Sequence, residues 1–418
     1  MTPEKLFHEL LGLGLKWEVT ECEYDREEGT VRLRIRETAE FWKQERSPEV
    51  GATVSCHDHT EELTWRHLNV FEHRCEIRCR LPRARCGKTG KVYRVRPPWE
   101  GLSKHFTKAF EAMALWLMRE MPMAAVARKL QETDTRLWRM LKAHVAAAYP
   151  AADWSQVSRV GCDEMSVRKG HRYISVFCDL TGKRVLVAVP GRDKSVWAKF
   201  TEALSQHHGR PGLIQEVSID MSPAYFAGAQ EQCSQARVVF DKFHVLAHLN
   251  QAVDEVRRVE SRLGADSSRD ALKKTAWMLR KNPSRHTEKE QKQRQRLESQ
   301  NLLTAKAYQM RLSLQDIYQI ESESKAKRKI QAWCRWVQRV AKKHPSLLFR
   351  AMVQCSQMIL RHLSGILAHW KLRTTNAFME GLMSVFSATK RKARGYRSTD
   401  NLITMLYFTS AHLRLPAH

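Results

Sequence analysis

Residues 159–169 read Arg-Val-Gly-Cys-Asp-Glu-Met-Ser-Val-Arg-Lys. The predictions for the rest of the chain start from this stretch. A short apolar run leads into Asp163, and the basic turn 168–171 leads to the β-branched and aromatic segment 173–179. This pattern predicts a hairpin of two strands. An acid inside an apolar strand is costly unless it is paired or binds a cation. Taken alone, however, Asp163 is better explained as a solvated residue at a strand end.

A second acid follows a second apolar strand. Residues 213–219 lead to Asp220, and Ser222-Pro223 then opens a helix. Two strands of one sheet that each deliver a carboxylate make a cation site of hard oxygen ligands, which suits magnesium. Glu380, in the segment 374–382, is the best candidate for a third carboxylate.

The charge of the chain points to a polyanionic partner. Its 418 residues contain 71 Lys and Arg against 45 Asp and Glu, which gives a formal net charge of +26. Such an excess predicts binding to nucleic acid. An anionic membrane surface is the alternative, but the sequence has no lipidation motif or long amphipathic anchor to support it. The length allows two to four domains.

The sequence also indicates a cellular compartment. It shows no secretion signal and no apolar run near the ~18 residues that a membrane span needs. Ten cysteines in so long a chain without such a signal indicate a reducing environment. We therefore expect a cytoplasmic protein without a membrane partner.

The first hundred residues divide into two predicted modules. Residues 1–45 form a mixed α/β piece, in which the alternation of the strand 16–24 slips midway. Residues 46–100 carry a histidine and cysteine cluster without any Cys-x-x-Cys pair, so zinc is doubtful there. The alternative is a β-rich module packed around Trp65 and Leu68. The cysteines in question are Cys56, Cys75, Cys79 and Cys86.

Residues 101–150 are predicted to be a helix-turn-helix domain. The helical segments 123–130 and 134–144 flank a short break, and Thr133 or Asp134 is placed to cap the second. This second helix would offer Arg136 and Arg139 to DNA. The alternative is an ordinary helical hairpin, but the positive charge favours DNA binding.

From residue 159 the pattern is three strands in a meander, then helix, strand, helix and strand, which predicts an α/β fold. A long basic helical region follows to about residue 370. Its tryptophans are more often core residues than base-stacking platforms. They are Trp277, Trp333 and Trp336. Glu380 then lies on a helix, and the basic run 390–396 after it is expected to contact phosphates.

Several motifs in fixed order carry a family resemblance. They are Gly-Cys-Asp-Glu-Met-Ser-Val-Arg-Lys-Gly-His-Arg-Tyr (161–173), Ile-Asp-Met-Ser-Pro-Ala-Tyr (219–225), Val-Phe-Asp-Lys-Phe-His-Val (239–245), Thr-Asn-Ala-Phe-Met-Glu-Gly-Leu (375–382) and the run 390–396. Together they resemble bacterial insertion-sequence transposases of the ISL-three family, over about residues 60–412.

The resemblance implies a DDE transposase with a ribonuclease H-like catalytic core. By position, Asp163, Asp220 and Glu380 match the catalytic, metal-binding triad. The implied catalytic domain comprises 159–245 and 371–412, interrupted by a helical insertion domain at 246–370. Asp241 and His244 match a downstream Asp-x-x-His feature of related transposases. The expected DNA-contacting residues are Arg136, Arg139, Arg168, Lys169, His244, Lys390, Arg391, Lys392 and Arg394.

The chain departs from the family pattern in its first domain. Relatives begin that domain with a zinc-binding Cys-x-x-Cys, whereas Ser47 and Val50 stand at that place here. Thr89 stands where the partner of Cys86 should be, which again puts zinc in doubt. In addition, Met383 occupies a position where many relatives have Asn.

The expected function is DNA transposition by two-metal phosphoryl transfer. The protein would bind the terminal repeats of its element, cleave the ends and transfer the 3′ ends to target DNA. Two magnesium ions, with manganese as a substitute, would be held by the triad, Asp163 bridging both. The expected assembly is a homodimer or higher oligomer on double-stranded DNA, at the bacterial nucleoid. The alternatives are a helix-turn-helix regulator without catalysis, and a nuclease of the same fold that cuts without joining.

Overall fold

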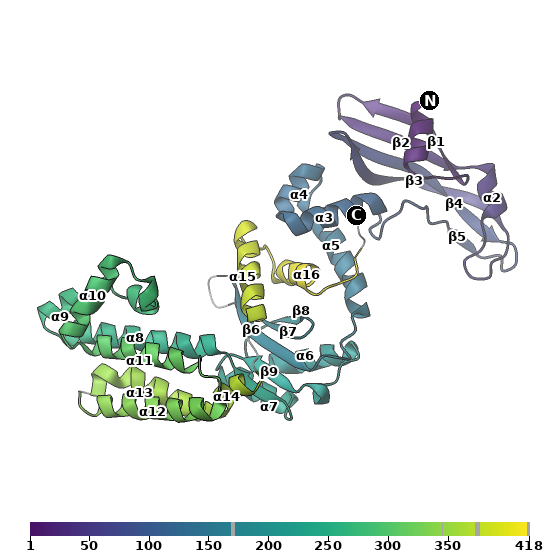
Figure 1. The fold of residues 1–418 in the computed structure, drawn as a ribbon. Coiled ribbons are helices and arrows are strands. Elements are labelled where there is room, and N and C mark those ends of the chain that lie inside the picture. Colours follow the sequence, from purple (N-terminus) through teal and green to yellow (C-terminus); the bar gives the residue numbers. More distant parts are fainter. Residues whose placement is uncertain (169–171, 345, 373–376, 416–418) are drawn as a thin grey trace. The chain divides into compact units, whose positions relative to one another are not determined.

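The computed structural model describes residues 1–168, 172–344, 346–372 and 377–415 (Figure 1). The chain divides into two compact units. Unit 1 comprises residues 1–152 and 387–418, and unit 2 comprises residues 153–386. Among the described residues, no helix is long and apolar enough to span a membrane.

Unit 1 begins with a five-stranded sheet in the order β1-β2-β4-β3, with β5 paired to β4. Strands β2 and β4 run parallel, and the other pairs are antiparallel. The residues 1–45 and 46–100, predicted as two modules, therefore share one sheet and one aromatic core. The elements are α1 (Pro3–Leu10), β1 (Trp17–Asp25), β2 (Thr30–Glu37), α2 (Ala39–Gln44), β3 (Val54–Val70), β4 (His73–Cys86) and β5 (Val92–Arg94).

The predicted helix-turn-helix follows in the same unit. Its helices are α3 (Lys108–Glu120), α4 (Met123–Leu130) and α5 (Asp134–Ala148), and the short 3-10 helix η1 (Tyr149–Ala151) ends it. Gln131 ends α4 in the left-handed conformation, with φ of 53°. The hydroxyl of Thr133 then caps α5 by accepting a hydrogen bond from the Arg136 backbone N–H, 3.4 Å away. Of the two predicted caps, the structure uses Thr133.

The C-terminal helix α16 (Thr399–Ser410) belongs to unit 1 and not to unit 2. Met405 and Phe408 of α16 are buried in one cluster with Phe110, Leu137 and other apolar residues of α3–α5. α16 thus buries its apolar side chains against the helix-turn-helix. The assignment of 371–412 to the catalytic domain stays a prediction.

Unit 2 contains a five-stranded sheet in the order β10-β9-β6-β7-β8. The hairpin strands β6, β7 and β8 are antiparallel, whereas β9 and β10 run parallel to β6. The predicted sequence of strands and helices is confirmed. The elements are β6 (Arg159–Arg168), β7 (Arg172–Asp179), β8 (Arg184–Pro190), α6 (Ser195–Gln206), η2 (Pro211–Leu213), β9 (Glu216–Ile219), α7 (Pro223–Gln232) and β10 (Arg237–Phe240).

The rest of unit 2 is helical, as predicted. Figure 1 shows α8, α11, α12 and α13 lying side by side, and neighbouring members of this group pack together. The buried carboxylate of Glu260 on α8 accepts hydrogen bonds from the backbone N–H groups of Leu303 (2.7 Å) and Thr304 (2.8 Å), which open α11. The elements are α8 (Lys242–Leu263), α9 (Asp266–Leu272), η3 (Met278–Arg280), η4 (Pro283–Arg285), α10 (Glu288–Ser299), α11 (Leu303–Ile317), α12 (Glu323–Ala341), α13 (Ser346–Arg361), α14 (Leu363–Leu372) and α15 (Ala377–Lys392), whose residues from 387 on belong to unit 1.

Candidate active site and nucleic-acid contacts

The parallel strands of unit 2 bring acidic residues together. Gly161 on β6 pairs with Ser218 on β9, so the same register continued by two residues places Asp163 beside Asp220. Phe240 on β10 pairs with Ile219 on β9, so Asp241 follows β10 directly beside Asp220. Carboxyl ends of parallel strands are where open α/β sheets bind ligands. Asp163 on β6 and the two acids that directly follow β9 and β10 therefore lie side by side at one sheet.

The carboxyl of Asp163 is half-buried, and its surroundings disfavour its negative charge. Burial raises its pKa to about 6, and the nearby carboxylates of Asp220 and Asp241 add to this, while His244 opposes it. One oxygen, Oδ1, accepts a hydrogen bond from the Glu164 backbone N–H at 2.7 Å. A cation in this position would offset the cost of holding the charge.

Asp220 and Asp241 each also shape the chain that follows. Oδ1 of Asp220 accepts a hydrogen bond from the Ser222 backbone N–H at 2.9 Å, at the entry to α7. Oδ1 of Asp241 accepts from the Phe243 backbone N–H, also at 2.9 Å, and caps α8. His244 lies one turn further along α8. Asp220 and Asp241 therefore lie where β9 and β10 end and where α7 and α8 begin.

Glu380 joins this group from the first turn of α15. Met379, its neighbour, packs on the bare Cα of Gly161, where a Cβ atom would lie 3.0 Å from Cγ of Met379. Burial and the charges of Asp241 and Asp163 raise the pKa of Glu380, against the opposing charges of Lys242 and His244. Among the described residues, the buried Oε1 atom of Glu380 has no hydrogen-bond partner.

The chemistry of these side chains fits a divalent cation. All four acids offer hard oxygen ligands, of the kind that magnesium and manganese prefer. The orphaned oxygen of Glu380 is a buried acceptor that a cation would satisfy. Within the described ranges, however, no three acids, histidines or cysteines lie close enough to hold one metal ion together. The carboxylates share an electrostatic environment without forming a closed coordination sphere.

The four cysteines considered for zinc do not form one cluster. Cys75 and Cys86 lie at opposite ends of β4, eleven residues or about 36 Å of extended strand apart. Cys75 and Cys79 are buried among apolar side chains, and burial raises the pKa of each thiol to about 12. Such thiols are poor metal ligands, because the thiolate is the binding form. Cys56 is exposed on β3.

Two equivalent turns surround Cys86. The Gly51 N–H donates to the carbonyl oxygen of Ser47 (2.8 Å), and the Gly90 N–H donates to that of Cys86 (2.9 Å). Both glycines have positive φ, 65° and 68°. Hydrogen bonds from Thr89, and then from Ser47, lower the pKa of the Cys86 thiol to about 7. Ser47 and Thr89, which stand in place of two of the family's zinc ligands, therefore hydrogen-bond to Cys86.

The two predicted DNA-contacting arginines of α5 have different surroundings. The guanidinium of Arg136 pairs with Glu132 at 2.8 Å and lies 4.7 Å from the centroid of the Phe106 ring. Arg139 is exposed, as is Lys142 one turn later. Arg136 is thus engaged in contacts within unit 1, whereas the side chains of Arg139 and Lys142 are exposed to solvent, where a polyanion could bind them.

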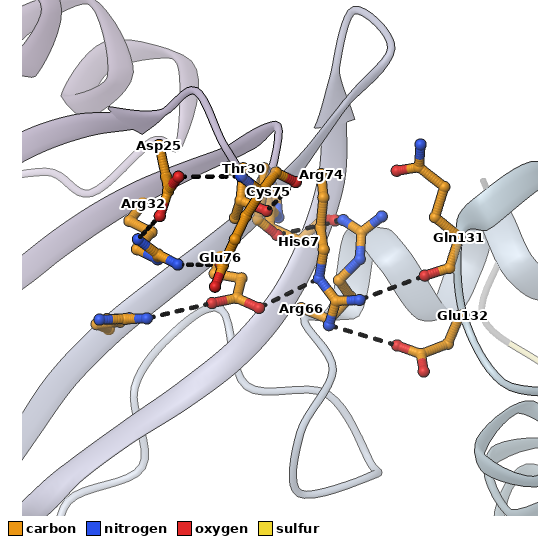
Figure 2. A network of polar contacts seen from close by, with 12 residues as sticks. Asp25, Thr30, Arg32, Arg66, His67, Arg74, Cys75, Glu76, Gln131 and Glu132 are labelled. Atoms are coloured by element: carbon orange, nitrogen blue, oxygen red, sulfur yellow. Dashed lines mark hydrogen bonds and ion pairs between the residues drawn. The ribbon is translucent and has the colours of Figure 1, made fainter.

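Sequence reasoning missed the residues that attach the helix-turn-helix to the sheet of unit 1 (Figure 2). The buried guanidinium of Arg66 on β3 donates to the Leu130 carbonyl oxygen at the end of α4 (2.9 Å). Arg74 on β4 donates to the Gln131 carbonyl oxygen (3.3 Å) and lies 3.9 Å from the carboxylate of Glu132. Burial lowers the pKa of Arg66 to about 10. No local sequence pattern distinguishes these arginines from surface ones.

The basic run after Glu380 ends α15. Arg391, Lys392 and Arg394 are exposed and Lys390 is half-buried. Within unit 1, to which both residues belong, the Lys392 ammonium donates to the Glu120 carbonyl oxygen at the end of α3, 2.7 Å away. Lys169 lies outside the described residues, and of Arg168 the structure describes only its place in β6.

Comparison with known proteins identifies the family of this chain. The DDE transposase model of the ISL3 family, described as "Transposase", matches residues 160–406. A second model, "Helix-turn-helix domain of transposase family ISL3", matches residues 103–145. The transposase for insertion sequence element IS1001 of Bordetella parapertussis is 27% identical over 94% of this chain and 95% of its own length. The transposase for insertion sequence element IS1557 of Mycobacterium tuberculosis is 25% identical over 97% of this chain and 95% of its own length. We call Asp163, Asp220, Asp241 and Glu380 the acidic centre. The family match covers more than half of the chain, and the two models together include the acidic centre and the helix-turn-helix, so the chain belongs to the ISL3 family of transposases.

Proposed function

We propose that this protein binds the terminal repeats of its insertion sequence, cleaves the element ends and joins the freed 3′ ends to target DNA. The proposed core is ribonuclease H-like, with a helical insertion at 246–370. The observation that carries the proposal is the register that places Asp163 beside Asp220, together with the orphaned buried oxygen of Glu380. Acids gathered at one sheet edge against a helix suit phosphoryl transfer better than structural support.

Asp163, Asp220 and Glu380 would hold the divalent ions. When bound, such ions activate water or a 3′-hydroxyl and stabilise the leaving oxygen. The protein's own contribution is to fix the carboxylates before DNA arrives. Hydrogen bonds from Glu164 and Ser222 orient Asp163 and Asp220, and Met379 on Gly161 fixes the start of α15. Asp241 adds negative potential, and His244 opposes it.

Unit 1 would supply recognition of double-stranded DNA. Arg139 and Lys142 are open on α5, which corresponds to the recognition helix of a helix-turn-helix. The basic run Lys390, Arg391, Lys392 and Arg394 adds phosphate contacts. Because two element ends must be held at once, we propose that the active form is at least a homodimer.

The test is cleavage of a labelled DNA that carries the element's own ends, with magnesium, with manganese and with EDTA. Wild-type protein should nick the DNA with either metal, and Asp163→Asn and Glu380→Gln should bind the ends but not nick them. An Arg139→Ala protein should lose end binding without losing its fold. Binding by the wild type without any metal-dependent nicking would instead favour a regulator.

A further inference from the structure

One face of α8 leads away from the acidic centre. His244, at the centre, is followed at intervals of four and three residues by side chains on the same face of the helix. They are His248, Gln251, Glu255 and Arg258. From His244 to Arg258 the helix rises about 21 Å. A DNA strand that follows this face of α8 away from the acids would contact several of these side chains.

The far part of this face lines an open groove with a volume of about 500 Å³. Its walls come from α8, from α13 and from Arg280 of η3, all in unit 2. The polar side chains that matter here are His248, Gln251, Arg258, Arg280, Gln354 and Arg361. The groove is polar along much of its length, so an apolar ligand or helix is a poor occupant.

The charges of the groove favour an anion. Two acids line it. Asp254 pairs with Arg257 and Arg258 at 2.8 Å each, and Glu255 lies 3.9 Å from Arg258 and from Arg262, so arginines offset both charges. Among the described residues, neither Arg280 nor Arg361 has an acidic partner. Unpaired guanidinium groups on the wall of a groove are suited to phosphate, which they bind through paired N–H donors.

An exposed tryptophan, Trp277, lies beside Arg280 at the edge of this region and is not itself one of the residues that line the groove. The Trp277 side chain is 66% exposed, whereas Trp333 of the same helical region is 3% exposed and donates a hydrogen bond to the Met310 carbonyl oxygen. The Arg280 guanidinium lies 6.0 Å from the centroid of the Trp277 ring. An exposed aromatic ring next to an unpaired guanidinium group is a combination that binds single-stranded nucleic acid.

We propose that this groove binds a single DNA strand, with an unpaired base stacked on Trp277 and phosphates on Arg280 and Arg361. The ligand is single-stranded because the bases of a duplex have no free face for stacking. The inference rests on the proposed function, since the strand would be one that cleavage or end-opening releases at the acids. It adds a second mode of DNA binding, separate from duplex recognition by unit 1.

The test measures binding of fluorescein-labelled oligothymidine of 20 nucleotides to the full chain, by anisotropy in EDTA, where no cleavage occurs. Trp277→Ala should weaken binding about tenfold, and Trp277→Phe should retain most of it. Arg280→Ala/Arg361→Ala should lower the slope of log affinity against log salt by about 1.4, since two phosphate contacts are lost. Lys327→Ala/Lys329→Ala, on the exposed face of α12, removes the same charge and should change the slope by less than half as much.

A second readout locates the base. Oligothymidine carrying one 5-iodouracil should cross-link on irradiation to the peptide containing Trp277, and Trp277→Ala should lose that product. The proposal is overturned if Trp277→Ala binds oligothymidine within twofold of wild type, or if the α12 pair has the same effect as the groove pair. The proposed function fails on a different result: absence of metal-dependent nicking by the wild type, whatever the oligothymidine data show.

Discussion

Asp241 lies directly beside Asp220, because the residues before them, Phe240 and Ile219, pair in parallel register on β10 and β9. Each acid accepts a hydrogen bond from the backbone N–H two residues further on. The centre therefore contains a fourth carboxylate next to the three that the sequence assigned to catalysis. It is 7% exposed and raises the pKa of both Asp163 and Glu380.

The fourth carboxylate should matter for metal-dependent cleavage. Asp241→Asn keeps an oxygen that can cap α8 but removes the negative charge, so cleavage should fall about 10- to 100-fold. The thermal midpoint should stay close to that of the wild type. Titration of cleavage against magnesium should show a higher half-saturating concentration. Wild-type cleavage at every magnesium concentration would show that Asp241 serves only as a helix cap.

The packing of α15 on β6 gives a prediction at Gly161. A Cβ atom there would lie 2.8 Å from Cδ2 of Leu180 and 3.0 Å from Cγ of Met379. Gly161→Ala should therefore shift the start of α15 and displace Glu380, and a displacement near 1 Å can lower cleavage by about 100-fold. Gly381→Ala is the matched control, because a Cβ atom there meets nothing within 4 Å. Equal cleavage rates for the two variants would contradict this role of Gly161.

Arg66 should be a stability determinant of unit 1. Arg66→Met leaves the buried carbonyl oxygens of Leu130 and Cys75 without this donor, which should cost about 2–4 kcal/mol. Arg74→Met, at a half-buried site on β4 that contacts the same turn after α4, should cost about 1 kcal/mol or less. Urea unfolding measures both. If the two variants lose the same stability, burial of Arg66 is not what fixes the helix-turn-helix to the sheet.

The paired turns around Cys86 allow a metal site to be restored. Ser47 and Val50 in one turn correspond to Cys86 and Thr89 in the other. The triple variant Ser47→Cys/Val50→Cys/Thr89→Cys would present four thiols at equivalent places, as a structural zinc site requires. It should bind one cobalt ion with the absorption of a tetrahedral thiolate complex, and zinc should displace it. Adding Cys86→Ser should abolish the complex; if cobalt binding persists, the metal is bound elsewhere.

Local sequence patterns predicted much of this structure. The hairpin around Asp163, the strand before Asp220 and the cap at Thr133 all follow from residues within a few positions of one another. Even the slip in the alternation of the first strand is a real β-bulge, between Val19 and Glu21. These features are set by the chain's immediate neighbours, so periodicity and turn residues reveal them.

What the sequence did not predict depends on contacts between distant segments. The parallel pairing of β2 with β4 and the packing of α16 on the helix-turn-helix involve residues far apart in the chain. Arg66 is buried, and Trp277 exposed, against the usual preference of each residue type. The place of Asp241 beside Asp220 follows from strand register, which a single sequence does not specify for parallel strands.

The division of unit 1 into an early and a late segment has a consequence for synthesis. During translation the N-terminal 152 residues emerge first, but Met405 and Phe408, which complete their helical core, emerge only after all of unit 2. Domains fold as they leave the ribosome, so unit 2 can finish before unit 1. A chain truncated by a late frameshift would thus keep its acidic centre yet lack a finished DNA-binding unit.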